Sequence, residues 1–131
     1  MTIAEVSKKY DLSQDTLRYY ERIGLIPAVK RTPSGIRDYT EESCSWIELA
    51  KCMRSAGVPI EALIEYCALT QQGDSTIKAR KELLLQERRN ILEKMEYMQQ
   101  SLDRLNYKIH RYENAEETGV LSWDKKNSDL P

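Results

Sequence analysis

The sequence predicts a mainly α-helical protein, in which a small head of short helices and one hairpin precedes a single long helix. Three observations lead to this fold class. Two short amphipathic segments meet at a tight turn within residues 2–24. Residues 27–40 contain two Pro and one Gly, as a turn between two extended pieces would. From Ser75 to about Tyr112 the chain has no Pro or Gly and repeats apolar residues every seven positions.

The first two helices are expected to form a helix-turn-helix. Thr2 and Glu5 have the spacing of a capping box, so the first helix should run from there to about Tyr10. A three-residue turn ends at Ser13, the expected N-cap of the second helix. On that helix Leu17 lies on the predicted core face together with Tyr20 and Gly24. The opposite, exposed face carries Gln14, Asp15, Arg18, Tyr19 and Arg22.

A hairpin and two further helices complete the predicted head. The turn at residues 33–35 makes residues 27–40 a wing that carries Lys30, Arg31 and Arg37. Thr40 should cap a third helix that runs to about Ala56 and stops at Gly57. Pro59 should open a fourth helix, whose apolar positions recur at i, i+3, i+4 and i+7.

The last helix predicts a homodimer. At 1.5 Å per residue, about 38 residues would span about 57 Å, too long to be covered by so small a head. A second copy should therefore cover its apolar stripe, whose heptad pattern is strict after about residue 91. The expected seam residues are Ile91, Met95, Met98, Leu102, Leu105, Ile109 and Tyr112. The predicted divisions are a head at 1–72, a dimerisation helix at 74–113 and a polar tail at 114–131, in which Trp123 could make a docking contact.

Charge placement favours a nucleic-acid partner. The net charge is −1, yet residues 8–39 hold seven cations against four anions. Arg and Tyr side by side on an exposed helix face suit phosphate oxygens and base edges. A helix-turn-helix places such a face in the major groove of DNA, and the wing would hold the flanking backbone.

Other classes of protein are disfavoured. No apolar run approaches a membrane span and no secretory signal is visible, so we expect a cytoplasmic protein without a membrane partner. The three cysteines lack metal-ligand spacing and a single His cannot build a zinc site, so no metal or cofactor is expected. No acid–base pair, nucleophile–His constellation or phosphate loop indicates an enzyme.

These features together resemble the MerR family of bacterial transcription regulators, over about residues 1–112. The matching segments are Ala4-Glu5-Val6, Thr16-Leu17-Arg18-Tyr19-Tyr20-Glu21, Gly24-Leu25-Ile26, Arg37-Asp38-Tyr39, Gly57-x-Pro59-Ile60 and the long helix. The resemblance implies a winged helix-turn-helix and an antiparallel coiled-coil dimer. It also implies a pseudo-palindromic promoter with an overlong spacer, which the regulator distorts so that RNA polymerase can engage it.

The resemblance also assigns roles to residues. Arg18 and Tyr19 match groove and phosphate contacts, and Arg37 and Tyr39 match wing contacts to the DNA backbone. Helical face and charge add four further candidates to this DNA-binding set. These are Gln14, Arg22, Lys30 and Arg31.

The expected signal is an aldehyde or another thiol-reactive electrophile. No Cys follows Cys67, which disfavours the metal and iron–sulfur sensors of the family, and too few residues follow Tyr112 for a drug-binding domain. The segment around Cys52 resembles the AdhR/NmlR-like subgroup, whose sensor is one Cys in this helix. Cys52 is therefore the candidate thiol of an activator, with Cys44 as runner-up. Two alternatives stay open: non-covalent sensing of a small ligand between head and dimer helix, and an interaction protein that does not bind DNA.

Overall fold

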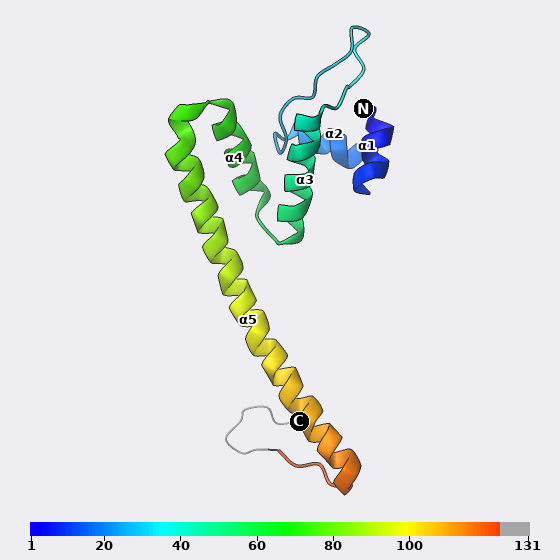
Figure 1. Cartoon of the computed structure of the whole chain (residues 1–131), viewed down its shortest axis with the longest axis vertical. Helices are drawn as coiled ribbons and strands as arrows, with labels where there is room; N and C mark the ends of the chain where they lie inside the picture. Colours follow the sequence, from blue (N-terminus) through cyan, green and yellow to red (C-terminus); the bar gives the residue numbers. More distant parts are fainter. Residues whose placement is uncertain (124–131) are drawn as a thin grey trace. The chain divides into compact units, whose positions relative to one another are not determined.

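The computed structural model describes residues 1–123 and confirms a mainly α-helical chain (Figure 1). The first compact unit, Met1–Arg88, contains four short helices, and the second starts at Arg89. The helices are α1 (Ile3–Tyr10), α2 (Gln14–Arg22), α3 (Glu41–Ser55), α4 (Ile60–Gln71), a short 3₁₀ helix η1 (Asp74–Thr76) and α5 (Ile77–Thr118).

Side-chain caps fix where the first three helices begin, at the residues predicted. The Thr2 hydroxyl accepts the Glu5 amide at 3.2 Å, and the Glu5 carboxylate accepts the Thr2 amide at 2.9 Å. The Ser13 hydroxyl accepts the amide of Thr16 at 3.0 Å. Thr40 caps α3 by the same reciprocal arrangement, with Ser43 in the position where Glu is usual.

The wing between α2 and α3 is a hairpin without regular strands. Its two arms meet at one isolated antiparallel bridge between Arg31 and Arg37. The turn closes through the Gly35 amide on the Thr32 carbonyl and the Thr32 amide on the Ile36 carbonyl, both at 2.8 Å. The predicted turn and pairing are therefore present. On the other side of the bridge the Asp38 amide donates to the Lys30 carbonyl at 2.7 Å, but the pairing extends no further, so the two expected extended pieces do not become strands.

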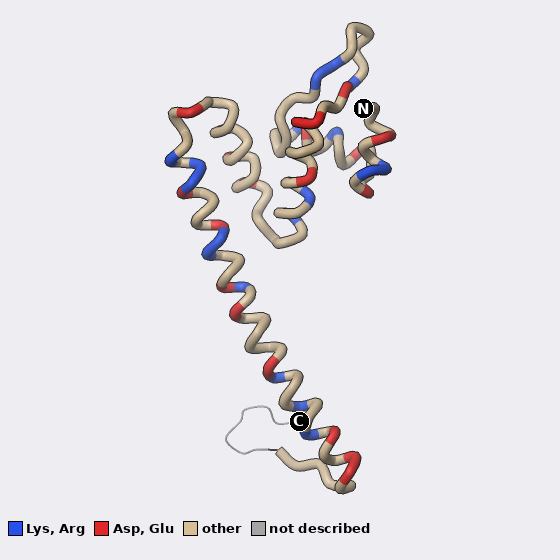
Figure 2. Tube along the Cα trace, viewed as in Figure 1, with Lys and Arg blue, Asp and Glu red and all other residues tan. Residues whose placement is uncertain are grey.

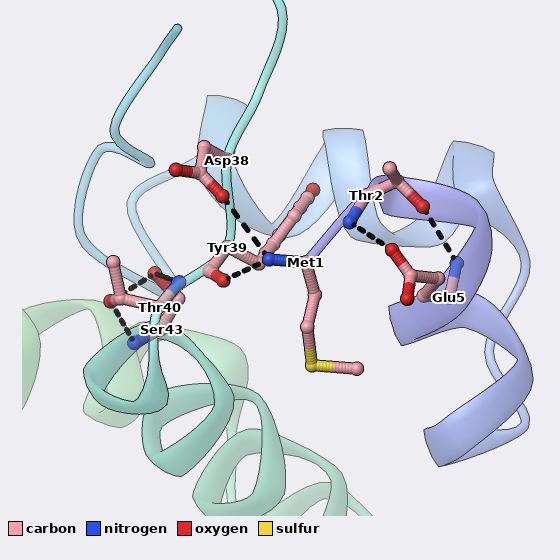
Figure 3. A network of polar contacts seen from close by, with 7 residues as sticks. All are labelled: Met1, Thr2, Glu5, Asp38, Tyr39, Thr40 and Ser43. Atoms are coloured by element: carbon pink, nitrogen blue, oxygen red, sulfur yellow. Dashed lines mark hydrogen bonds and ion pairs between the residues drawn. The ribbon is translucent and has the colours of Figure 1, made fainter.

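The core of the head gathers residues from every helix and from the wing. Buried side chains are Val6, Leu17, Leu25, Ile26, Val29, Tyr39, Cys44, Ile47, Ala50, Val58, Leu63 and Cys67. Figure 3 shows how the end of the wing is joined to the first residue. The Tyr39 amide donates to the Met1 carbonyl at 2.8 Å, and the Met1 amino group donates to the Tyr39 carbonyl at 2.7 Å and to Asp38 at 3.1 Å.

Helix α5 begins after η1 and runs to Thr118, beyond the predicted end near Tyr112. It stops where Gly119 adopts a φ of +79°, a left-handed conformation that glycine allows without steric cost. Residues 114–118, expected in a polar tail, are therefore helical. The first compact unit also continues past the predicted boundary at residue 72 and includes the first three turns of α5.

The second unit leaves its apolar stripe open. Met95, Met98, Leu102, Leu105, Ile109 and Tyr112 are each about half exposed or more, and Ile91 is half-buried. Beyond Gly119 the chain returns to the helix, and the Trp123 ring lies edge-on to Tyr112 at 5.8 Å between centroids. Residues 124–131, the rest of the predicted tail, lie outside the described part of the chain.

Candidate nucleic-acid interface

The exposed face of α2 carries the four predicted contact residues. Gln14, Arg18, Tyr19 and Arg22 are all exposed. The Arg18 guanidinium donates to Asp15 at 3.0 Å and to Gln14 at 3.4 Å, while the Arg22 guanidinium lies 5.3 Å from the Tyr19 ring. Because the Asp15 side chain is 97% exposed, its ion pair with Arg18 is held in water and adds little stability. Arg18 can therefore exchange this partner for a phosphate or a base at small cost.

Glu21 joins α2 to the wing through two hydrogen bonds. One carboxylate oxygen accepts Arg37 Nε at 2.7 Å, and the other accepts the Val29 amide at 2.8 Å. The side chains of Glu21 and Arg37 are 13% and 25% exposed, so this ion pair is mostly out of water. This bond through Nε restrains the orientation of the Arg37 guanidinium.

The environment of Glu21 favours its charged form. Burial acts to raise the pKa of this carboxyl, but the bonds from Arg37 and the Val29 amide outweigh it and hold the pKa below its usual value of 4.5. The residue thus stays an anion at neutral pH. The sequence did not predict this role, although Glu21 lies four residues after the core residue Leu17, a spacing that places an acid at the edge of the α2 core face.

The wing supplies the remaining cations. Lys30 and Arg31 are exposed, and Arg31 Nη1 donates to the Gly35 carbonyl across the turn at 2.9 Å. Figure 2 shows basic positions along the wing and acidic positions at the start of α3. The α2 face and the wing therefore belong to one cationic part of the head, joined through Glu21.

Tyr39 does not lie where an exposed wing contact was expected. Its side chain is 2% exposed and packs in the core, and its hydroxyl has no hydrogen-bond partner. Burial raises the pKa of this hydroxyl, although Arg37, Arg18 and Arg31 are close enough to act against the rise. The contact of Tyr39 with the DNA backbone therefore stays a prediction, and it requires the buried hydroxyl to become accessible.

The three cysteines differ in access. All are free thiols: Cys52 is exposed in the last turn of α3, whereas Cys44 and Cys67 are buried. Burial raises the pKa of the Cys67 thiol. The cations on either side of Cys52 both bind backbone carbonyls: Lys51 that of Tyr10 and Arg54 that of Val58.

Cys44, the runner-up thiol, lies beside a surface hollow between α1 and α3. This hollow has a volume of about 550 Å³ and is lined in part by Lys9, Tyr10, Cys44 and Glu48. Burial and the neighbouring Cys44 together raise the pKa of the Tyr10 hydroxyl. Cys44 itself is 6% exposed, so a reagent in this hollow reaches little of its sulfur.

Residues 1–123 also bear on metal binding and on membrane insertion. That range holds no group of three His, Cys, Asp or Glu side chains arranged to bind a metal ion. None of its helices combines the length and apolar character needed to span a bilayer.

Comparison with known proteins identifies the family. Residues 1–70 match the MerR HTH family regulatory proteins. The chain is 59% identical to the HTH-type transcriptional regulator AdhR of Bacillus subtilis over 93 residues, which are 71% of this chain and 66%, just under two thirds, of that protein. It is 30% identical to an uncharacterised HTH-type transcriptional regulator of Haemophilus influenzae over 120 residues, covering 92% of this chain and 89% of that one.

Solved structures agree with this match. A putative MerR family regulator from Listeria monocytogenes has a TM-score of 0.85 and 47% identity, with 86% of each chain covered. HiNmlR, described as a MerR family regulator lacking the sensor domain and bound to promoter DNA, has a TM-score of 0.80 and 30% identity, with 92% of this chain and 95% of that chain covered. The helix-turn-helix, the wing and these relatives together show that the chain belongs to the MerR family of DNA-binding transcriptional regulators and is not an enzyme.

Proposed function

We propose that this regulator binds a pseudo-palindromic promoter as an antiparallel homodimer and activates transcription when an aldehyde or a related electrophile modifies Cys52. The exposure of Cys52, in contrast to the burial of Cys44 and Cys67, is the observation that carries the sensing assignment. The identity with AdhR supports the choice of aldehydes. Activation would follow from distortion of an overlong promoter spacer, which lets RNA polymerase engage both promoter elements.

The DNA contacts proposed for each head come from α2 and the wing. Arg18 and Tyr19 would enter the major groove, with Gln14 and Arg22 at its edges. Lys30, Arg31 and Arg37 would hold the flanking phosphates, and their cluster is supported by the Glu21 bridge to Arg37. Tyr39 would add a phosphate contact through its unpartnered hydroxyl, provided that DNA binding uncovers the oxygen.

The proposed dimer rests on the open stripe of α5. Leu102, Leu105 and Ile109 are each about half exposed on a helix that has no second layer within residues 89–123. Their heptad spacing is that of a coiled-coil seam, and a second copy of the same helix would bury it.

The proposed chemistry at Cys52 is addition to a carbonyl. The sulfur bonds to the aldehyde carbon and the thiol proton passes to the oxygen, which gives a hemithioacetal without any change of oxidation state. Only the thiolate attacks, so the rate follows exposure and thiolate fraction. Exposure separates Cys52 from the other two thiols.

In vitro transcription with purified polymerase, with and without formaldehyde, tests the assignment. We expect Cys52→Ser to keep the operator affinity of the wild type and to lose induction, because serine does not form a stable adduct. Cys44→Ala and Cys67→Ala are matched controls that should remain inducible. Full induction of the Cys52→Ser variant would overturn the sensing role and favour a ligand bound without covalent chemistry. Failure of the wild-type protein to bind the operator at all would overturn the DNA-binding proposal itself.

A further inference from the structure

A buried polar cluster joins the end of α4 to the start of α5. Its centre is Thr76, a polar residue only 8% exposed. The Thr76 hydroxyl lies 2.6 Å from the Leu69 carbonyl and 2.8 Å from the Gly73 carbonyl, to which it can donate, and it accepts Arg80 Nε at 3.0 Å. Arg80 Nη2 and the Thr76 amide also donate to the Gly73 carbonyl, both at 3.1 Å. We call these four residues the Thr76 cluster.

The Thr76 cluster adds side-chain hydrogen bonds to two backbone carbonyls at and just beyond the end of α4. The last carbonyls of an α-helix have no partner within the helix and carry partial negative charge. Here the Thr76 hydroxyl lies 2.6 Å from the Leu69 carbonyl in the last turn of α4, and the Arg80 guanidinium donates to the carbonyl of Gly73, which at a φ of +88° turns the chain toward η1. Because Thr76 and Arg80 also belong to the next helical segments, the same bonds fix the first turns of α5 to the last turn of α4.

A small rotation at this junction produces a large displacement farther along α5. Helix α5 is continuous from Ile77 to Thr118, so its midpoint lies about 31 Å from its first residue at 1.5 Å per residue. A rotation of about 5° at the junction displaces a point at that distance by about 2.7 Å, close to the 3.4 Å rise of one base pair. In a dimer joined through α5, a loose junction would let each head shift by nearly one base pair.

We propose that Thr76 and Arg80 are positioning residues that determine which spacing of the two half-sites the dimer accepts. The inference rests on the proposed dimer and its two half-sites. The Thr76 cluster is not in contact with DNA in this view. It discriminates between promoters by resisting rotation of the head, so that a half-site displaced by one base pair meets a misplaced recognition helix.

Operator binding as a function of spacer length tests the proposal. The variants are Thr76→Val, which keeps the shape but removes the hydroxyl, and Arg80→Met. Their controls are Thr76→Ser, which keeps the hydroxyl, and Lys78→Met, which removes an exposed positive charge from α5, the helix that carries Arg80. Affinity is measured on the preferred operator and on operators whose spacers are one and two base pairs longer or shorter.

We expect the wild type and both controls to prefer one spacing strongly. In Thr76→Val and Arg80→Met the ratio of affinity for the preferred operator to affinity for one changed by a base pair should fall at least threefold. The loss of affinity for the preferred operator itself should be smaller than this. Equal weakening on every operator would show that the Thr76 cluster only stabilises the head and would overturn the proposal. An unchanged penalty in both variants would also overturn it.

A measurement without DNA separates this inference from the proposed function. A spin label on a cysteine introduced at the exposed Ser45 of α3, in a Cys52→Ser background, reports the distance between the two heads of a dimer by pulsed electron paramagnetic resonance. Thr76→Val should broaden that distance distribution, and Thr76→Ser should restore its width. An unchanged width in a proven dimer overturns the inference alone. If the otherwise unmodified protein gives no distance signal between two copies, the proposed dimer is wrong, and the inference is wrong with it.

Discussion

Replacing Glu21 by Gln is the sharpest test of how the α2–wing surface works, because two physical effects predict opposite results. The change removes one negative charge from beside the proposed DNA-binding surface of each head, which by itself should strengthen binding to phosphate. It also breaks the bridge that orients Arg37 and fixes Val29, which should weaken binding. The sign of the change in affinity therefore decides whether Glu21 mainly repels DNA or mainly positions the wing.

The structure allows both effects to be estimated. A unit charge about 8 Å from a phosphate in water contributes about 0.5 kcal/mol of repulsion, and salt screens it further. Gln can accept one of the two hydrogen bonds, but its NH₂ group faces the other donor. A hydrogen bond to a charged group contributes about 1.5–3 kcal/mol, so the bridge should lose about 2 kcal/mol in each head. If a net loss of about 1 kcal/mol per head remains once the repulsion is subtracted, the two heads together lose about 2 kcal/mol of binding free energy. This is about 30-fold in affinity.

Fluorescence anisotropy with a labelled operator, over a range of salt concentrations, measures the effect. Asp15→Asn is the matched control, because Asp15 lies on the same helix but is 97% exposed and bonds only to Arg18 among the contacts described above. We expect that control to bind equally or slightly more tightly. Tighter binding by Glu21→Gln at every salt concentration would refute the positioning role and leave simple repulsion as the explanation.

Acid denaturation supplies an independent check on the same residue. The pKa of Glu21 is depressed in the folded head, so its charged form contributes stability above the ordinary value of 4.5. That contribution is lost as the pH falls below 4.5 toward the folded-state pKa. Glu21→Gln should therefore flatten the decline in unfolding free energy in this window. A decline equal to that of the wild type would contradict the pKa shift.

Three further predictions follow from the same surfaces. Arg18→Ala should weaken operator binding by about 1–3 kcal/mol for each half-site and reduce its salt dependence, whereas Lys81→Ala should not; equal losses would contradict the α2 contact. Tyr39→Phe should raise the unfolding free energy by about 1 kcal/mol, because it removes an unsatisfied buried hydroxyl, and yet lower operator affinity; unchanged affinity would exclude a phosphate contact. Leu102→Lys should convert the dimer to a monomer in analytical ultracentrifugation, with the exposed Gln99→Lys as control, and a persistent dimer would refute the seam.

Local rules were sufficient for the helix starts in the head. Thr2, Ser13 and Thr40 cap helices because their hydroxyls satisfy amides two or three residues away, and such information is contained within a short window. The stop at Gly57 follows equally local chemistry. Polarity alone does not predict the end of α5, because residues 113–118 are mostly polar but contain no helix breaker, and the helix continues through them.

Long-range partners account for the residues that the sequence could not place. Glu21 meets Arg37 across 16 positions, and the wing has to fold before the carboxylate has a partner. Tyr39 was expected at a wing contact to the DNA backbone, yet its side chain is buried in the core of the head. Heptad spacing predicted the seam of α5, but the attachment of its first turns to α4 depends on Thr76 and Arg80, whose partners lie across a chain reversal.

The position of Cys52 explains how a small adduct could influence the recognition helix. Its neighbour Lys51 donates to the Tyr10 carbonyl, at the end of α1, and so ties the last turn of α3 to the helix that packs on α2. A bulky group on the exposed thiol would compete for space one residue from this contact, without entering the core. Because α1, α2 and the wing are connected by the Met1–Tyr39 pairing and by Glu21, a shift at Lys51 would move them together. The proposed response therefore requires no unfolding of the head, only a change in how α3 holds the proposed DNA-binding surface.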